Sequence, residues 1–297
     1  MEDFNFVIPQ LSEKILNSIE TKYLDLAYAN ESDSQKLDIY LPENVLKPYP
    51  VIIHFHGGAF AFGTKRDDNF EPMLRGLKRG YAIISVEYRM SGEARWPALI
   101  FDAKAAVRFI RANANHYGLN ADKIAVWGPS AGGYIAGMLG VTNRNPVFED
   151  PGQGNAEYSS EVQAVVDWCG PCGGFITMDK YIKENGIGFP DHNAPDSPES
   201  RIMGSPIQNI EQLVYFASPY RYANKDIPPF LIMHGESDPV VPVQQSRFFA
   251  EELIKAAGTD KVKLLTYPGK GHHGQPWYDE ECISDVVFEF LDDVFRR

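Results

Sequence analysis

The stretch from Ile124 to Gly133 constrains the fold of this chain more than any other part of it. It reads Ile-Ala-Val-Trp-Gly-Pro-Ser-Ala-Gly-Gly, so a strand-like apolar run passes through Gly-x-Ser-x-Gly into residues that suit a helix start. This order predicts a sharp strand-to-helix turn that holds the hydroxyl of Ser130 out of a sheet. Gly128 and Gly132 lack Cβ atoms, which lets neighbouring elements pack closely against such a turn. Because the five-letter pattern alone is common, its meaning depends on partners elsewhere in the chain.

Short apolar runs alternate with helical patterns along the rest of the chain. Residues 23–29 and 36–41 alternate apolar and polar side chains, which predicts an antiparallel hairpin at a sheet edge. Continuous apolar runs, typical of buried parallel strands, occupy 51–55, 81–86, 124–127, 162–167, 230–233 and 262–267, and helical stretches occupy 97–117, 131–141, 243–257 and 280–295. The alternation predicts an α/β fold with a mostly parallel eight-stranded sheet and helices on both faces.

Residues 171–226 interrupt this alternation. They are rich in Pro, Gly, Ser and Asn, and their apolar periodicity is weak. A structureless loop of that length is uncommon inside a compact domain. We therefore expect residues 1–297 to form one domain, with a lid-like cap at about 171–226 over the active-site end of the sheet.

Charge and hydropathy exclude several classes of partner. The net charge of −12 would repel nucleic acid and anionic membranes, and no apolar run approaches the ~20 residues of a membrane span. The first residues show no basic segment followed by an apolar core, and three cysteines do not make a disulfide framework. We expect a cytoplasmic protein without nucleic-acid or membrane partners, although a trimmed leader and a homo-oligomer both stay open.

A glycine pair follows the predicted strand at 51–55 and suits an oxyanion hole. Gly57 and Gly58 let the backbone bend so that N–H groups face a cavity, and the N–H of Ala131 would complete the set of donors. His56 is expected to brace this loop by hydrogen bonds rather than act as a base.

Two further loops supply an acid and a base for the serine. Asp238 follows a buried strand and a glycine turn, with Glu236 as the weaker candidate for the acid. His272 follows another strand between glycines and is the expected base, with His273 as its alternative. The chain order Ser130, Asp238, His272 is the one expected of α/β-hydrolases. No pair of histidines has zinc-ligand spacing with a third partner, so no metal is expected.

Several motifs together carry a family resemblance that runs from about residue 36 to the end of the chain. They are His56-Gly57-Gly58, Val86-Glu87-Tyr88-Arg89, Trp96-Pro97-Ala98, Gly128-Pro129-Ser130-Ala131-Gly132-Gly133, Pro198-Glu199-Ser200-Arg201, Ala217-Ser218-Pro219 and the run from His234 to Pro242. The chain resembles the esterase/lipase group related to hormone-sensitive lipase, and within it the branch that contains bacterial feruloyl and acetyl esterases. The resemblance implies a serine carboxylesterase for small acyl or aryl esters that needs no cofactor. Ala59 stands where many relatives have a third glycine, which leaves the shape of the acyl pocket open.

Aromatic residues near the predicted loops are candidates for the walls of a substrate pocket. Phe60, Tyr134, Phe175 and Trp277 are the tentative substrate-binding residues, because ligand sites are mostly apolar with few polar groups.

Three alternative functions stay open at this stage. An arylformamidase would use the same triad, but that family usually carries Trp where this chain has Phe60. A hydrolase fold can also serve as a non-catalytic binding protein. Cys169-Gly170-Pro171-Cys172 matches the thioredoxin redox motif and could form a disulfide, but two glycines follow where a redox motif would continue into a helix.

Overall fold

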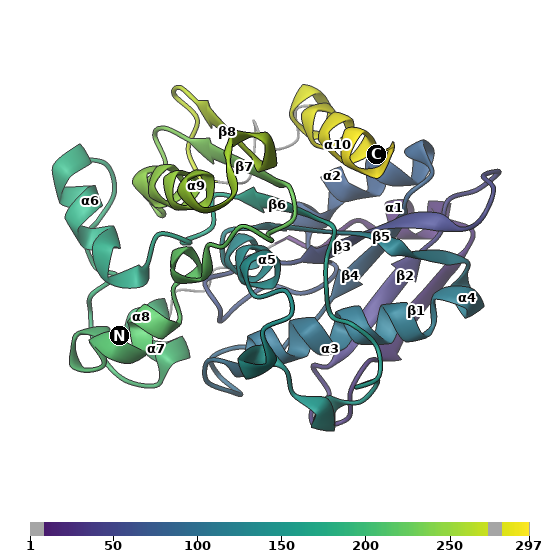
Figure 1. The fold of residues 1–297 in the computed structure, drawn as a ribbon, viewed down its shortest axis with the longest axis horizontal. Helices are drawn as coiled ribbons and strands as arrows, with labels where there is room; N and C mark the ends of the chain where they lie inside the picture. The colour runs from purple at the N-terminus through teal and green to yellow at the C-terminus, as the bar shows by residue number, and fades with distance from the viewer. Residues whose placement is uncertain (1–8, 273–280, 297) are drawn as a thin grey trace.

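An eight-stranded sheet forms the centre of the protein in a computed structural model that describes residues 9–272 and 281–296 (Figure 1). The strands are β1 (Lys22–Ala27), β2 (Lys36–Tyr40), β3 (Tyr49–Phe55), β4 (Ala82–Val86), β5 (Leu119–Pro129), β6 (Ala164–Trp168), β7 (Phe230–Gly235) and β8 (Val262–Tyr267). They lie in the order β1-β2-β4-β3-β5-β6-β7-β8. The pairs β1–β2 and β2–β4 are antiparallel and all other pairs are parallel. The predicted mostly parallel sheet with an antiparallel hairpin at its edge is confirmed.

Helices cover both faces of this sheet. They are α1 (Glu13–Ser18), α2 (Glu71–Leu74), α3 (Ala98–Ala112), α4 (Ala114–Tyr117), α5 (Ala131–Val141), α6 (Met178–Asn185), α7 (Pro198–Met203), α8 (Glu211–Phe216), α9 (Gln244–Ala257) and α10 (Glu281–Arg296). Side chains from α3, α5 and α9 form one buried cluster with the sheet, and side chains from α2 and α10 form a second cluster. The helix predicted over 97–117 divides into α3 and α4, because Asn113 between them leaves helical geometry.

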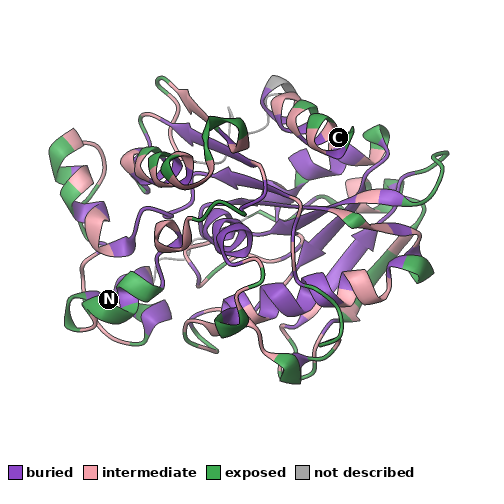
Figure 2. Ribbon diagram, in the orientation of Figure 1, coloured by how far each residue is buried: buried purple, intermediate pink, exposed green. Residues whose placement is uncertain are grey.

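Strands β4, β6 and β7 are buried along their whole length, and β3 is buried at every position but Pro50 (Figure 2). Successive residues of β3 enter different clusters, since Ile53 packs with α3 and α5 while Ile52 packs with α10. A strand covered on both faces needs apolar side chains at every position rather than at every second one. This is why the continuous apolar runs in the sequence identified these strands.

The segment predicted as an insertion lies between β6 and β7 and holds α6, α7 and α8, which Figure 1 shows together beyond one end of the sheet. Ile202, Ile207 and Val214 of this segment are buried in the same cluster as α3 and α5. The insertion therefore packs onto the main core. That it acts as a lid stays a prediction. None of the described helices is both long and apolar enough to cross a membrane.

Candidate active site

Ser130 occupies a strained turn between β5 and α5. Its backbone has φ 54° and ψ −120°, a combination that side-chain-bearing residues rarely adopt. Its N–H donates to the carbonyl of Trp168 at 2.7 Å, and the residue is 7% exposed. Such strain persists only where the surroundings hold it, and it gathers at functional sites. The turn thus has the geometry that the Gly-x-Ser-x-Gly pattern predicted.

Two glycines make this turn sterically possible. A Cβ atom on Gly132 would lie 1.9 Å from the carbonyl oxygen of Phe55, at the end of β3. A Cβ atom on Gly128 would lie 2.3 Å from the carbonyl carbon of Gly132. The start of α5 therefore packs directly against the end of β3, where the predicted oxyanion loop begins.

The loop after β3 turns sharply because Gly58 has a φ of 109°. The carbonyl of Gly58 accepts hydrogen bonds from the N–H groups of Ala61 and Phe62, both at 2.9 Å. A Cβ atom on Gly58 would lie 2.2 Å from the carbonyl oxygen of Phe62, so this position has room only for glycine. The residues predicted for the oxyanion hole, Gly57 and Gly58, lie in this turn. Their role as donors stays a prediction.

His56 braces this loop by hydrogen bonds, as expected. Its ring nitrogens lie 2.8 Å from the carbonyl oxygen of Gly57 and 2.9 Å from a carboxylate oxygen of Glu87. Both partners accept hydrogen bonds only, so both nitrogens must donate and the ring carries a positive charge. Burial works against that charge, but Glu87 raises the pKa of His56 above its ordinary value. The ring also stacks on Tyr88 with centroids 4.4 Å apart.

The acid and base candidates meet at the same edge of the sheet as Ser130. Strands β5 to β8 are parallel neighbours, so their carboxyl ends place the following loops together. Nδ1 of His272 lies 2.6 Å from Oδ2 of Asp238. The other oxygen, Oδ1, accepts the N–H groups of Val240 and Val241 at 2.8 and 2.9 Å. The alternative acid, Glu236, bonds instead to Arg247 and Thr266.

His234 is a member of this site that the sequence did not reveal. Its Nε2 lies 3.1 Å from Oδ2 of Asp238, and its Nδ1 lies 2.7 Å from the hydroxyl of Ser246. His234 and Asp238 are both buried. The carboxylate of Asp238 is thus held by two main-chain donors and two histidines, which fixes its direction toward His272.

The opposite charges of Asp238 and His272 stabilise each other. Burial alone would raise the pKa of Asp238, but the charge of His272 and the hydrogen bonds from His234 and His272 lower it below its ordinary value. Burial alone would lower the pKa of His272, but the Asp238 charge raises it well above its ordinary value. An imidazolium formed at His272 is therefore stabilised by a carboxylate that stays ionised.

The insertion contacts the loop that carries Asp238. His192 places one ring nitrogen 2.9 Å from the carbonyl oxygen of Val240 and the other 3.1 Å from the carboxylate of Glu199. A Cβ atom on Gly188 would lie 2.1 Å from the carbonyl oxygen of Pro239. The insertion thus packs against the turn that orients the acid, a contact that no sequence pattern indicated.

The predicted aromatic residues form a buried cluster. Phe60, Tyr134 and Phe175 are each at most 2% exposed, and their ring centroids lie 5.2–5.7 Å apart. They join the loop after β3, α5 and the insertion. Trp277 lies outside the described residues. Substrate contact by these four side chains stays a prediction.

The two cysteines of the redox-like motif are buried and are not joined by a disulfide. The sulfur of Cys172 lies 3.8 Å from the carbonyl oxygen of Gly133 in α5. Cys169 has a φ of 48°, and its sulfur lies beside Asp238 and His272. The motif is therefore built into the candidate site, with the thiol of Cys169 near the Asp238–His272 pair and that of Cys172 against α5.

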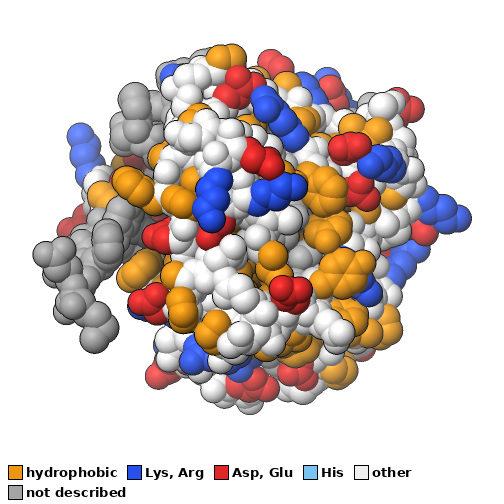
Figure 3. Space-filling model, turned by 90° about the vertical axis from the view of Figure 1, so that its left-hand side faces the viewer, with side chains coloured by type: hydrophobic (Ala, Val, Ile, Leu, Met, Phe, Trp, Pro, Cys, Tyr) orange, Lys and Arg blue, Asp and Glu red, His pale blue; other side chains and the backbone are white. Residues whose placement is uncertain are grey.

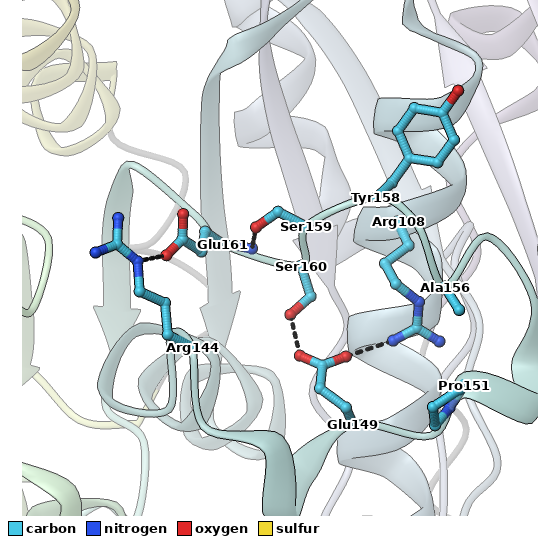
Figure 4. Close-up of a pocket in the computed structure, with 9 residues that line it drawn as sticks. All are labelled: Arg108, Arg144, Glu149, Pro151, Ala156, Tyr158, Ser159, Ser160 and Glu161. Carbon is cyan, nitrogen blue, oxygen red and sulfur yellow. Dashed lines mark hydrogen bonds and ion pairs between the residues drawn. The ribbon is translucent and has the colours of Figure 1, made fainter.

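A hollow lined by charged side chains lies away from this site (Figure 4). Its wall includes Glu161, which precedes β6, whereas Ser130 follows the opposite end of the parallel neighbour β5. Arg108 bonds to Glu149 at 2.5 Å, and Arg144 bonds to Glu161. Since these side chains satisfy one another, the hollow is a structural ion-pair network and not a second candidate site.

The side of the molecule that carries the insertion helices shows hydrophobic side chains among charged ones (Figure 3). Phe189, Tyr215 and Phe216 of the insertion are 81%, 47% and 47% exposed. The guanidinium of Arg221 lies 3.8 Å from the ring centroid of Tyr215.

Comparison with known proteins identifies the family. A family model described as BD-FAE matches residues 37–253, and one described as TAP-like protein matches residues 216–294. The chain belongs to the BD-FAE family. It is an α/β-hydrolase of the esterase group related to hormone-sensitive lipase, as the resemblance implied.

Several proteins that are similar to this chain are described as esterases. A solved structure described as "Truncated form of carbohydrate esterase from gut microbiota" is 31% identical with a TM-score of 0.82, and the match covers 97% of this chain and 100% of that one. "Bifunctional GH43-CE Bacteroides eggerthii" is 31% identical with a TM-score of 0.80, covering 92% of this chain and 35% of that one. Esterase LipC of Mycobacterium tuberculosis is 31% identical, covering 82% of this chain and 57% of that protein. The chain thus spans little more than half the length of LipC.

Proposed function

We propose that this member of the BD-FAE family is a serine carboxylesterase. The observation that carries the proposal is the strained Ser130 turn at the same sheet edge as the His272–Asp238 pair, whose nearest atoms are 2.6 Å apart. A serine hydroxyl is a poor nucleophile until a base removes its proton. The esterase names of the relatives support the same reaction class.

In the proposed reaction, His272 accepts the proton of the Ser130 hydroxyl as its oxygen forms a bond to the ester carbonyl carbon. Asp238 orients the imidazole and stabilises its positive charge, and does not itself take a proton. His272 then protonates the leaving alcohol as the carbon–oxygen bond to that alcohol breaks. Water repeats the sequence on the acyl-enzyme, releases the acid and restores Ser130.

The N–H groups of Gly57, Gly58 and Ala131 are proposed to hold the oxyanion of the tetrahedral intermediate. The close packing of α5 on the end of β3 supports this assignment, because it puts the first N–H of α5 next to the glycine loop. Losing one such donor costs about 10²–10³ in turnover.

We propose small acyl or aryl esters, such as acetyl or feruloyl groups on sugars, as the substrate class. Two relatives that match this chain carry a carbohydrate esterase or "GH43-CE" description, which supports an acyl group on a sugar. The insertion at 171–226 is proposed to select the substrate, because its His192, between α6 and α7, contacts the loop of Asp238. Rates on matched acetyl, butyryl, octanoyl and feruloyl esters test this part. A preference for octanoyl over acetyl and feruloyl esters would contradict it.

The reaction itself is tested with Ser130→Ala and p-nitrophenyl acetate. Ser218→Ala is the matched control, because that serine is also buried and bonds only within the insertion, to Val214. We expect the control to keep its activity and the Ser130 variant to lose it while unfolding at the same urea concentration as the wild type. Undiminished hydrolysis by a folded Ser130→Ala protein would refute the proposal.

A further inference from the structure

Three potential metal ligands converge at the carboxyl end of the sheet. They are the sulfur of Cys169 after β6, a carboxylate oxygen of Asp238 after β7 and a ring nitrogen of His272 after β8, and these atoms lie within 4.8 Å of one another. Thiolate, imidazole and carboxylate are the ligand types that bind Zn²⁺ in proteins. Within residues 9–272 and 281–296, no other three such side chains come this close. The large sequence separations explain why ligand spacing along the chain did not reveal the group.

Two of the three residues, Asp238 and Cys169, are held in place by their surroundings. Asp238 is fixed by the N–H groups of Val240 and Val241 and by Nε2 of His234. The backbone of Cys169 is fixed by the bond from its N–H to the carbonyl of Met233 at 2.8 Å. Partners of this kind orient metal ligands and strengthen binding. Zinc ligands sit roughly 2.0–2.3 Å from the ion at tetrahedral angles, so an ion bound between Nδ1 of His272 and Oδ2 of Asp238 would replace their 2.6 Å hydrogen bond and widen that separation by roughly 1 Å.

An ion can also reach this group from solvent. Cys169 and Asp238 are buried, but the side chain of His272 is 15% exposed. The open side of His272 provides the entry path, and water would fill the fourth coordination position. Three protein ligands plus one water is a common arrangement for zinc.

We propose that Cys169, Asp238 and His272 form an inhibitory Zn²⁺ site that shares its acid and base with the proposed catalytic machinery. Binding releases the thiol proton of Cys169 to solvent, together with the second ring proton of His272 when the imidazole is charged, and forms Zn–S, Zn–N and Zn–O bonds. If the ion binds Nε2 of His272, the acceptor for the serine proton is blocked. If the ion binds Nδ1, the proton of the neutral ring lies on Nε2. Nε2 then cannot accept the serine proton either. The ion therefore stops the esterase without contacting Ser130.

The inhibition by Zn²⁺ rests on the proposed function, whereas the binding of the metal does not. Metal binding and inhibition are therefore measured by two separate readouts. The reduced 297-residue chain, freed of metals by chelation and dialysis, is titrated with Co²⁺ and its absorption recorded. A thiolate ligand gives a sulfur-to-cobalt charge-transfer band that a site of oxygen and nitrogen ligands lacks. Zn²⁺ inhibition of p-nitrophenyl acetate hydrolysis is measured on the same samples.

The matched variants are Cys169→Ser and Cys172→Ser, since both cysteines are buried and belong to the same short motif. We expect the band in the wild type and in Cys172→Ser, and its loss in Cys169→Ser. The Zn²⁺ concentration for half inhibition should rise at least tenfold in Cys169→Ser, because even outer partners of a metal site contribute about 10–100-fold. Excess chelator should restore activity.

Absence of the band in the wild type overturns the site, whether or not the variants fold. A band that survives in Cys169→Ser overturns the assignment of its ligand. A band in an active enzyme that Zn²⁺ does not inhibit overturns the inhibitory role. A band in a chain without esterase activity supports the site and refutes the proposed function instead.

Discussion

Replacing Glu87 by Gln tests whether the charge of its carboxylate positions the predicted oxyanion loop after β3. Glu87 accepts a hydrogen bond from the fully buried ring of His56 at 2.9 Å, and its own side chain is 17% exposed. The substitution keeps the shape of the side chain but removes its charge. A hydrogen bond to a charged group contributes about 1.5–3 kcal/mol. We therefore expect Glu87→Gln to lower the free energy of unfolding by about 2 kcal/mol near pH 6.

The loss of unfolding free energy in Glu87→Gln should depend on pH in a defined direction. The pKa of His56 is raised in the folded state, so its contribution is complete below the ordinary value of about 6.5 and is lost as pH rises through the folded pKa. The pKa of Glu87 is lowered, so its contribution is present above the ordinary 4.5 and is lost as pH falls through the folded pKa. The difference between wild type and variant should thus be largest near pH 6 and shrink toward about pH 9.

The assay combines urea unfolding at both pH values with steady-state kinetics. We expect kcat to fall about 10–100-fold with little change in KM, less than the cost of deleting an oxyanion donor outright. Glu93→Gln is the control, because that exposed carboxylate accepts hydrogen bonds from the hydroxyls of Ser32 and Ser34 and not from His56. A Glu87→Gln protein with wild-type stability at pH 6, or with the same loss at both pH values, would refute the reasoning.

Three further predictions concern the turn, the base and the insertion. Gly132→Ala should destabilise the fold by about 3 kcal/mol or more in urea unfolding, because its Cβ would lie 1.9 Å from a carbonyl oxygen, whereas Gly92→Ala, with open space around it, should change little. The value of kcat/KM should rise with pH through a midpoint above about 6.5, since His272 accepts a proton only when neutral and Asp238 raises its pKa; a midpoint below 6.5 would contradict this. His192→Gln should lower the melting temperature and reduce kcat more than it raises KM, because it loosens the loop that holds the acid; unchanged kcat would exclude that coupling.

The sheet could be predicted from the sequence because the apolar composition of each buried strand indicates by itself that the strand is buried. Strand β5 is apolar from Ile124 to Trp127 because it is covered on both faces, and this needs no knowledge of the neighbouring strands. The serine turn was predictable for a similar reason, since its geometry depends on two local glycines. The acid and base candidates followed from loops after recognisable strands.

Contacts between distant segments were not predictable in this way. Glu87 lies 31 residues from His56, and His192 lies 48 residues from Val240, so nothing in either local pattern indicates the partner. The helices of the insertion were missed because six or eight residues span too few turns to show an apolar period. His234 is only four residues from Asp238, but a turn between them decides whether they face each other.

The most direct test of the central claim is the site at which a fluorophosphonate probe labels the protein. Ser130, in its strained turn at the same sheet edge as the His272–Asp238 pair, is predicted to be the nucleophile. Mass spectrometry of the digested adduct should find one phosphonyl group per chain, on Ser130, with hydrolysis lost in proportion to labelling. Labelling of another residue, or full labelling of Ser130 in a protein that still hydrolyses esters, would contradict the account.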